Sequence, residues 1–300
     1  MSYEEIIIPG RDLYSLAVRV YDVPNPKAVV KCIHGMEEHQ GRYQPFAEFL
    51  NKHGYAVVTA DLRGHGKNAP KLSHIADKNG HKLLIEDEKV IKEYIQKRYP
   101  GIPLILFGHS MGTIISRVLL QSDSKDFTKV VLSGYPNPMP VGAIGGFLSG
   151  TIGLFKGRKG YSKMLTNMVL GPFNKALENP KTPLDWLSYN EANVIAYDKD
   201  PLCGEEFTIG SYNALFHLVG AINSVGKYKN VNVDCPILLI SGEDDPCTSG
   251  EKGRKASLDR LQKAGFKNIE VETIKGMRHE ILNETGKEQV YEDILKFLEK

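Results

Sequence analysis

The chain has 300 residues, of which 41% are hydrophobic and 25% are charged, and its 38 basic side chains nearly balance its 36 acidic ones. A chain of this length buries a core large enough to fold without disulfides or a structural metal. Its ordinary composition excludes a wholly disordered, collagen-like or coiled-coil protein. The formal net charge of +2 provides no general field for nucleic acid, so we expect no nucleic-acid partner.

The four cysteines are few for a chain of this length, and they show neither a C-x-x-C pair nor the spacing of a zinc site. This usage is typical of a reducing compartment. The N-terminal segment carries acidic residues where a secretion signal carries basic ones, and its apolar run, Ile6 to Ile8, is short. These features predict a cytoplasmic protein.

Strand and helix signals alternate over the first 133 residues. Apolar or β-rich segments predict strands at residues 13–21, 28–33, 55–60, 103–107 and 129–132, and apolar residues at helical spacing predict helices at residues 43–53, 84–99 and 110–121. The pattern returns with strands at 235–240 and 268–274 and helices at 252–264 and 284–299. Alternation of this kind predicts an α/β fold, with a mainly parallel sheet and helices on both of its faces.

Residues 134–234 interrupt this alternation with helix-like pieces and loops. We therefore expect a core domain made of residues 1–133 and 235–300, with a mostly helical cap inserted at 134–234. Residues 130–155 carry no charge and are numerous enough to span a membrane, but their glycines, prolines and strand-like start argue against a transmembrane helix. A basic segment from Lys156 to Lys163 follows. We favour a buried cap helix here, and the alternative is a lid in peripheral contact with lipid aggregates that carry anionic headgroups.

The strand at 103–107 runs into Gly108-His-Ser-Met-Gly112 and then into a helix, which is the G-x-S-x-G pattern in its strand-to-helix context. Such a tight turn projects the serine hydroxyl from the sheet, so Ser110 is the candidate nucleophile. The alternative is a glycine-rich turn with a helix-capping serine. A serine hydroxyl needs a base to take its proton, and His279 is the histidine in a loop after the last predicted strand.

Two further parts complete this chemistry. A carboxylate should orient the histidine, and the loop after the strand at 235–240 offers Glu243, Asp244 and Asp245, among which spacing alone does not decide. Two N–H groups should hold the developing oxyanion. We expect them from the backbone of Met111, at a helix N-terminus, and of Met36, in the loop after the strand at 28–33.

Metal and nucleotide sites have little support. His34 and His39 are five residues apart, which does not place two imidazoles on one helix face, and no H-E-x-x-H occurs. His65, in Asp61-Leu-Arg-Gly-His-Gly66, is interpreted as a structural loop histidine. The chain has neither a P-loop nor a G-x-G-x-x-G motif, so we expect no cofactor and no metal.

Five segments occur in order along the chain: His34-Gly-Met-Glu-Glu-His-Gln-Gly-Arg-Tyr43, Asp61–Gly66, Gly108–Gly112, Gly242–Pro246 and Arg278–Glu280. Taken together, they resemble the monoacylglycerol lipase and lysophospholipase group of α/β-hydrolases. This group is part of the serine aminopeptidase-like hydrolases. The resemblance spans about residues 25 to 298 and implies an α/β-hydrolase fold with a cap over the site. It implies Asp245 as the acid, His279 as the base and Met36 in the oxyanion-hole position. Two residues depart from the family pattern: the family usually has glycine where this chain has Glu37, and often a small residue where it has Met36. These larger side chains are expected to narrow the acyl pocket or to change the length of acyl chain that it prefers.

The function predicted is hydrolysis of carboxylic esters through an acyl-enzyme, with monoacylglycerol or lysophospholipid as the substrate. The alternatives are a broad carboxylesterase or thioesterase for short acyl chains, a peptidase-like amidase, and a binding scaffold without catalysis. In the cap, Tyr212, Phe216 and His217 are candidates for the pocket lining or for the cap core.

Overall fold

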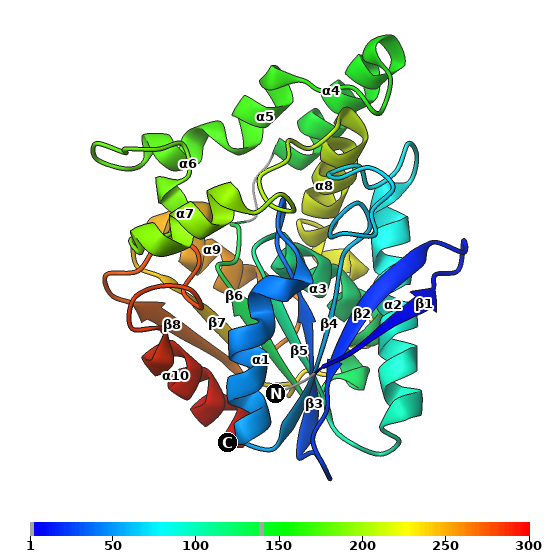
Figure 1. Ribbon diagram of the computed structural model, residues 1–300, viewed down its shortest axis with the longest axis vertical. Coiled ribbons are helices and arrows are strands. Elements are labelled where there is room, and N and C mark those ends of the chain that lie inside the picture. Colours follow the sequence, from blue (N-terminus) through cyan, green and yellow to red (C-terminus); the bar gives the residue numbers. More distant parts are fainter. Residues whose placement is uncertain (1–2, 138–140) are drawn as a thin grey trace.

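The computed structural model describes residues 3–137 and 141–300. They form an 8-stranded sheet in the order β1-β2-β4-β3-β5-β6-β7-β8 (Figure 1). The strands are β1 (Glu4–Pro9), β2 (Ser15–Tyr21), β3 (Ala28–Ile33), β4 (Tyr55–Ala60), β5 (Leu104–His109), β6 (Lys129–Ser133), β7 (Ile237–Gly242) and β8 (Ile269–Ile274). β1 and β2 are antiparallel to their neighbours, and the pairs from β4 across to β8 are parallel.

The helices follow the strands in the expected alternation, except between β6 and β7. The α-helices are α1 (Gln44–Lys52), α2 (Gly80–Arg98), α3 (Met111–Asp123), α4 (Val141–Lys156), α5 (Lys163–Val169), α6 (Gly171–Lys175), α7 (Glu191–Lys199), α8 (Ile209–Ile222), α9 (Gly250–Lys263) and α10 (Lys287–Glu299). Short 3-10 helices are η1 (Gln40–Tyr43), η2 (Ser124–Asp126), η3 (Asp185–Leu187), η4 (Val225–Lys227) and η5 (Pro246–Thr248).

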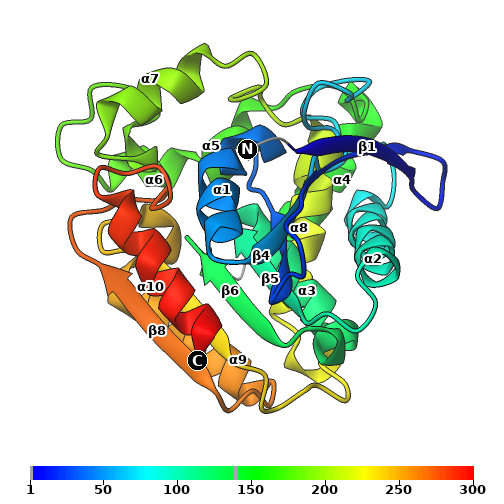
Figure 2. The same ribbon diagram turned by 60° about the horizontal axis from the view of Figure 1, so that its bottom comes forward.

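The sheet is buried on both faces, because successive side chains of each strand point to opposite sides. In β3, Val30 and Cys32 join a core with α1 and α10, whereas Val29 and Ile33 join a second core with α2, α3 and α9. Figure 2 shows α1 and α10 on one side of the sheet and α2 on the other. The continuous apolar runs that predicted the central strands are what a parallel sheet covered on both faces requires.

The predicted α/β-hydrolase fold is confirmed, and the predicted central strands match the observed ones to within a few residues. β1 was not among the predicted elements. Its apolar run, Ile6 to Ile8, is short because β1 is an edge strand with alternating exposure, paired with β2 alone. Such a strand has no hydrophobic signature comparable to that of the central strands.

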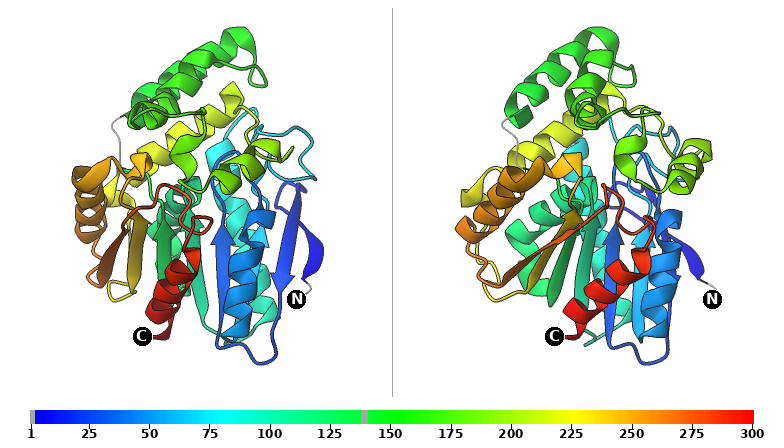
Figure 3. Two further views of the ribbon diagram at one scale, coloured as in Figure 1. Left: turned by 60° about the vertical axis from the view of Figure 1, so that its left-hand side comes forward. Right: turned by 90° about the vertical axis from the view of Figure 1, so that its left-hand side faces the viewer.

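The segment from α4 to α8 lies over the ends of the strands that carry the candidate site loops, away from the chain termini (Figure 3). Its described residues form helices and loops and no strand. α8 is apolar on nearly all sides and packs on α2, α3 and α4. The residue limits of a separate cap stay a prediction.

α4 is only partly the buried helix that the sequence favoured. One side packs closely on α8, where a Cβ added to Gly145 would lie 2.4 Å from the Phe216 ring. The other side exposes large apolar side chains, with Phe147, Leu154 and Phe155 exposed by 73%, 78% and 86%. Among the described residues, no helix has the length and apolar character needed to cross a membrane.

Candidate active site

Ser110 occupies the turn between β5 and α3. Its backbone has φ 50° and ψ −119°, a conformation that costs energy for any residue other than glycine. The N–H of Ser110 donates to the carbonyl of Ser133 in β6 at 3.0 Å, and the carbonyl of Ser110 accepts the N–H of Thr113 at 2.9 Å. These bonds hold the strained turn that G-x-S-x-G predicted between a strand and a helix.

Asp245 and His279 meet at the ends of β7 and β8. Nδ1 of His279 lies 3.0 Å and 3.1 Å from the two carboxylate oxygens of Asp245, and both side chains are buried. Burial alone disfavours the imidazolium, but the charge and hydrogen bond of Asp245 outweigh it and raise the pKa of His279 above 6.5. With Nδ1 donating to Asp245, Nε2 is the nitrogen left to accept a proton, and Sγ of Cys247 lies 3.9 Å from it. Of the three acids left open by spacing, Asp245 is the one bonded to the imidazole.

Ser110 and His279 line the same cavity, of about 80 Å³, together with Met36 and Met111. Most of the other lining is apolar and comes from α3, α5, α6, α8 and the loops between them: Ile114, Pro136, Met168, Val169, Phe173, Trp186, Leu187, Leu215, Phe216 and Val219. Since Asp245 is hydrogen-bonded to His279, the structure brings together all the residues that the sequence singled out for catalysis.

In the loop that follows β3, Met36 has a backbone N–H that is not used by the loop itself. The N–H of Gly35 donates to Oε1 of Glu38 at 2.6 Å, and the N–H of Glu37 donates to Nε2 of His65 at 3.4 Å. The N–H of Met36, between them, has no acceptor among the residues that the structure describes. A Cβ on Gly35 would lie 3.0 Å from Cβ of Ser110, so glycine is what allows the loop to pass this close.

Met111 is the first residue of α3, and its N–H therefore has no acceptor within the helix. The N–H groups of Met36 and Met111 are thus both available beside Ser110. Donors fixed in this way can stabilise negative charge that develops on an oxygen bound between them.

His34 and His65 are neutral imidazoles that form hydrogen bonds with the loop after β3. Nδ1 of His34 donates to the carbonyl of Gly35 at 2.8 Å, and its Nε2 accepts the N–H of Leu62 at 2.9 Å. Burial lowers the pKa of His34 to about 4 and that of His65 to about 3. Both nitrogens of His65 are also engaged, with Glu37 and with the carbonyl of Arg63. Neither ring offers a free lone pair to a metal.

Within residues 3–137 and 141–300, two groups of side chains place possible metal-ligand atoms within 4.8 Å of one another. One is Asp245, Cys247 and His279, in which the imidazole and carboxylate are already paired. The other is His39, Asp200 and Cys203. Since Nδ1 of His39 accepts the N–H of Gly41, its Nε2 carries the proton and donates to Asp200 at 2.9 Å, so this imidazole is also engaged.

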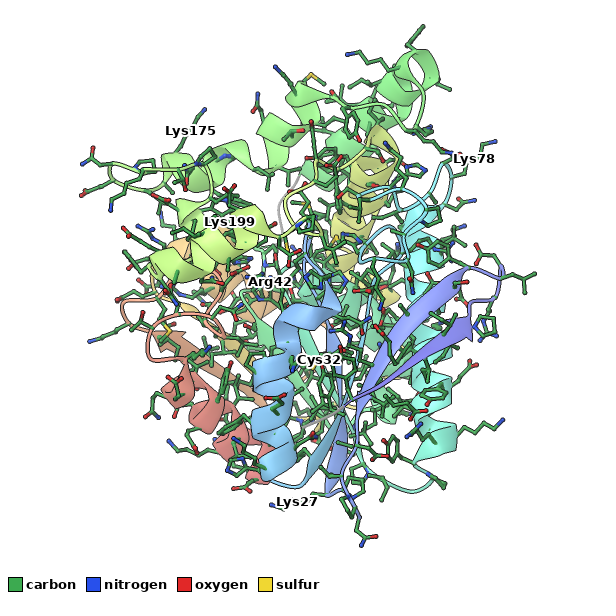
Figure 4. All side chains as sticks on the ribbon, viewed as in Figure 1. Lys27, Cys32, Arg42, Lys78, Lys175 and Lys199 are labelled. Atoms are coloured by element: carbon green, nitrogen blue, oxygen red, sulfur yellow. The ribbon has the colours of Figure 1, made fainter. Side chains whose placement is uncertain are left out.

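A buried ion network that the sequence analysis missed supports the site. Nη1 of Arg42 donates to Glu38 at 3.0 Å, and Nη2 donates to Glu280 at 2.7 Å and to Asn193 at 3.0 Å. Arg42, labelled in Figure 4, thereby joins the loop after β3 to the loop that carries His279 and to α7. Burial alone would raise the pKa of Glu38 and Glu280, but the charge of Arg42 lowers both below the ordinary range. The signal available in the sequence was the spacing of Glu38 and Arg42 in the first quoted segment.

The structure separates the three residues that the sequence left open between pocket lining and cap core. Phe216 lines the cavity. Tyr212 is buried in the hydrophobic core, with its hydroxyl 3.2 Å from Thr166, and His217 stacks on His81 at 4.7 Å. Trp186, the single tryptophan, was not considered from the sequence. Its ring lies 5.0 Å from that of His279 and helps to cover the imidazole.

Comparisons with known proteins identify the family and the fold. A family described as "Serine aminopeptidase, S33" matches residues 24–286. The chain is 26% identical to a monoacylglycerol lipase of Mycolicibacterium smegmatis over 93% of this chain and 92% of that one, and 27% identical to human monoglyceride lipase over 73% and 66%. The crystal structure of a carboxyl esterase from Bacillus coagulans in complex with glycerol superposes with a TM-score of 0.90 at 25% identity, covering 100% of this chain and 98% of that one.

Proposed function

This chain belongs to the serine aminopeptidase S33 family of hydrolases, and we propose that it is a carboxylic ester hydrolase acting on monoacyl lipids, with monoacylglycerol as the favoured substrate. The observation that carries the proposal is the imidazole of His279, which is bonded to Asp245 and lines the same cavity as the strained Ser110. Two relatives that act as monoacylglycerol lipases by name support the substrate class.

In the proposed reaction, Oγ of Ser110 attacks the ester carbon while Nε2 of His279 takes its proton. The backbone N–H groups of Met36 and Met111 bind the oxyanion of the tetrahedral intermediate. His279 then gives the proton to the departing alcohol, leaving an acyl-serine. Water, deprotonated by His279, releases the acid and restores Ser110. Asp245 keeps the imidazole in the required tautomer and stabilises the imidazolium.

The apolar lining of the cavity supports an acyl chain as the part of the substrate held there. A lysophospholipid and a short-chain ester present the same acyl group and carbonyl, so lysophospholipase and general carboxylesterase activity are the alternatives. The carboxyl esterase with the same fold is a reason to include short esters in the test.

We further propose that the exposed face of α4 contacts lipid aggregates. Ile144, Phe147, Leu154 and Phe155 present apolar side chains to solvent, and Lys156 follows them directly. Lys159 and Lys163, in the next turns, are also exposed. An apolar face edged by cations suits the boundary between acyl chains and anionic headgroups, which is where a monoacyl lipid resides.

The test compares monoacylglycerols, lysophospholipids, short p-nitrophenyl esters and an aminoacyl anilide with the same enzyme preparation. We expect the highest kcat/KM for a monoacylglycerol, and a fall of about 10⁴ or more for every ester in Ser110→Ala. An active-site phosphonate should add its mass to the protein, and Ser110→Ala should take up none. Unaltered ester turnover in Ser110→Ala, or labelling at another residue, would refute the assignment.

A further inference from the structure

A second cavity adjoins the one that contains Ser110 and has a different character. Its volume is about 640 Å³, and it shares Glu37, Trp186 and Tyr197 with the first cavity. Its other lining mixes hydrogen-bonding side chains with apolar ones: Thr166, Asn167, Asn174, Lys181, Thr182 and Glu206 among the first, and Leu170, Pro180, Pro183 and Leu184 among the second. The two cavities meet at Glu37, and the second, named the polar cavity below, has the larger share of polar groups in its lining.

Glu37 occupies this junction at a conformational cost. Its φ is 58°, in the left-handed region that favours glycine, and its side chain is almost fully buried. The backbone is already fixed without the side chain, because the carbonyl of Glu37 accepts the hydroxyl of Tyr197 at 2.7 Å and the N–H of Gly204 at 2.9 Å. The loop therefore does not need a carboxyl at this position to keep its shape.

The carboxyl of Glu37 is only partly satisfied by the protein. Oε1 accepts the N–H of Phe207 at 3.2 Å, and Oε2 has no hydrogen bond to any other described residue. Burial, with a smaller contribution from the charge of Glu206, raises the pKa of Glu37 to about 8. Near neutral pH this group is a carboxylic acid, which can donate one hydrogen bond and accept another.

We propose that Glu37 is a specificity residue that hydrogen-bonds a hydroxyl group of the alcohol portion of the ester, and that the polar cavity receives this portion. An ester whose carbonyl lies at Ser110 and whose acyl chain fills the apolar cavity must place its alcohol elsewhere, and the adjoining polar cavity is the space beside it. A neutral polyol of the glycerol type matches a neutral carboxyl, because each group both donates and accepts. The inference rests on the proposed ester hydrolysis and deepens it.

The experiment compares 1-monolauroylglycerol with propyl laurate, which have the same acyl chain and the same three-carbon alcohol skeleton and differ only in the two free hydroxyl groups of the glycerol. The measured quantity is the ratio of their kcat/KM values in the wild type, Glu37→Leu and Glu37→Gln. We expect Glu37→Leu to lower the ratio about tenfold, the effect of losing one hydrogen bond. Glu37→Gln, whose amide also donates and accepts, should keep the ratio within about threefold.

Glu251→Leu is the matched control, since Glu251 is exposed and outside both linings, and it should leave the ratio as in the wild type. An unchanged ratio in Glu37→Leu, or an equal fall in Glu37→Gln and Glu37→Leu, would overturn the proposal. If Glu37→Leu fails to fold, the ratio in Glu37→Gln still decides, because a fall beyond tenfold contradicts the hydrogen-bonding role. A wild type that hydrolyses neither ester would instead refute the proposed function.

Discussion

Replacing Arg42 by methionine is expected to lower the free energy of unfolding by about 3–5 kcal/mol. Methionine keeps much of the apolar stem but removes the guanidinium, which leaves the carboxylates of Glu38 and Glu280 buried without their cation. Removing one partner of a buried ion pair costs about 3–5 kcal/mol. The upper end of this range applies here, because one guanidinium serves two carboxylates that are each almost fully buried.

Urea unfolding at pH 7, followed by circular dichroism, measures this loss. Arg42→Lys retains the positive charge but not the bidentate geometry of the guanidinium, so its free energy of unfolding should lie between those of Arg42→Met and the wild type. Lys255→Met removes an exposed pair with Asp259 and should cost at most about 0.5 kcal/mol. An Arg42→Met variant within about 1 kcal/mol of this control would refute the reasoning.

The linkage between protonation and stability gives the same experiment a second readout. Arg42 lowers the pKa of Glu38 in the folded protein, so the stability it contributes is present above the unfolded value of 4.5 and is lost as the pH falls below it. The deficit of Arg42→Met should therefore shrink when the pH is lowered from 7 towards 3. A deficit independent of pH would point to lost packing rather than to the ion network.

The remaining predictions concern catalysis and lipid contact. Asp245→Asn should reduce kcat by about 10⁴. Because Asp245 raises the pKa of His279, the acidic limb of the pH profile of kcat/KM should lie above pH 6.5 in the wild type and move to lower pH in the variant. An acidic limb that stays in place would contradict the pairing. The double change of Leu154 and Phe155 to aspartate should weaken sedimentation with phosphatidylglycerol vesicles at least tenfold, whereas turnover of soluble p-nitrophenyl acetate should change less than twofold. Equal vesicle binding in both proteins would exclude this face of α4 as the contact.

Much of the fold could be predicted because a parallel sheet covered on both faces leaves a strong local signal. The strands β3, β5 and β7 consist of buried residues throughout, and their apolar runs stand out in the sequence. β1 lacks a long run of this kind because none of its residues is buried and two are half-buried. α4 was harder to interpret, since a charge-free helix is consistent with burial on all sides as well as with one exposed apolar face.

In the candidate site, too, some residues could be predicted from the sequence and others could not. Ser110 and Met111 belong to one short motif whose strand and helix neighbours are visible in the sequence, so their placement could be predicted. Arg42 and Glu280 are 238 residues apart, and no spacing rule connects them. Their pairing depends on which loops the sheet order brings together, and this is a property of the folded chain. Trp186 lies in the segment where the sequence shows no regular alternation, so its position over His279 carried no local signal.

Glu37 and Glu38 are adjacent in the chain, yet the structure predicts opposite pH dependences for them. Glu38 faces Arg42, whereas Glu37 is buried beside other acids, and its pKa is raised from 4.5 to about 8. A raised pKa means that the folded state loses stability as the pH rises from 4.5 to about 8, by at most about 1.4 kcal/mol per pH unit. Glu37→Gln removes this titration, so its unfolding free energy relative to the wild type should increase between pH 5 and pH 8.

Glu38→Gln is the matched comparison, because the same substitution one residue later removes a carboxylate that Arg42 stabilises. It should be less stable than the wild type at pH 7, and its deficit should diminish as the pH falls below 4.5. Urea unfolding of both variants across pH 3 to 8 measures the two trends. If Glu37→Gln lost stability with rising pH as Glu38→Gln does, Glu37 would be ionised in the folded protein. The polar cavity would then present a fixed negative charge, which suits a cationic alcohol better than a neutral polyol.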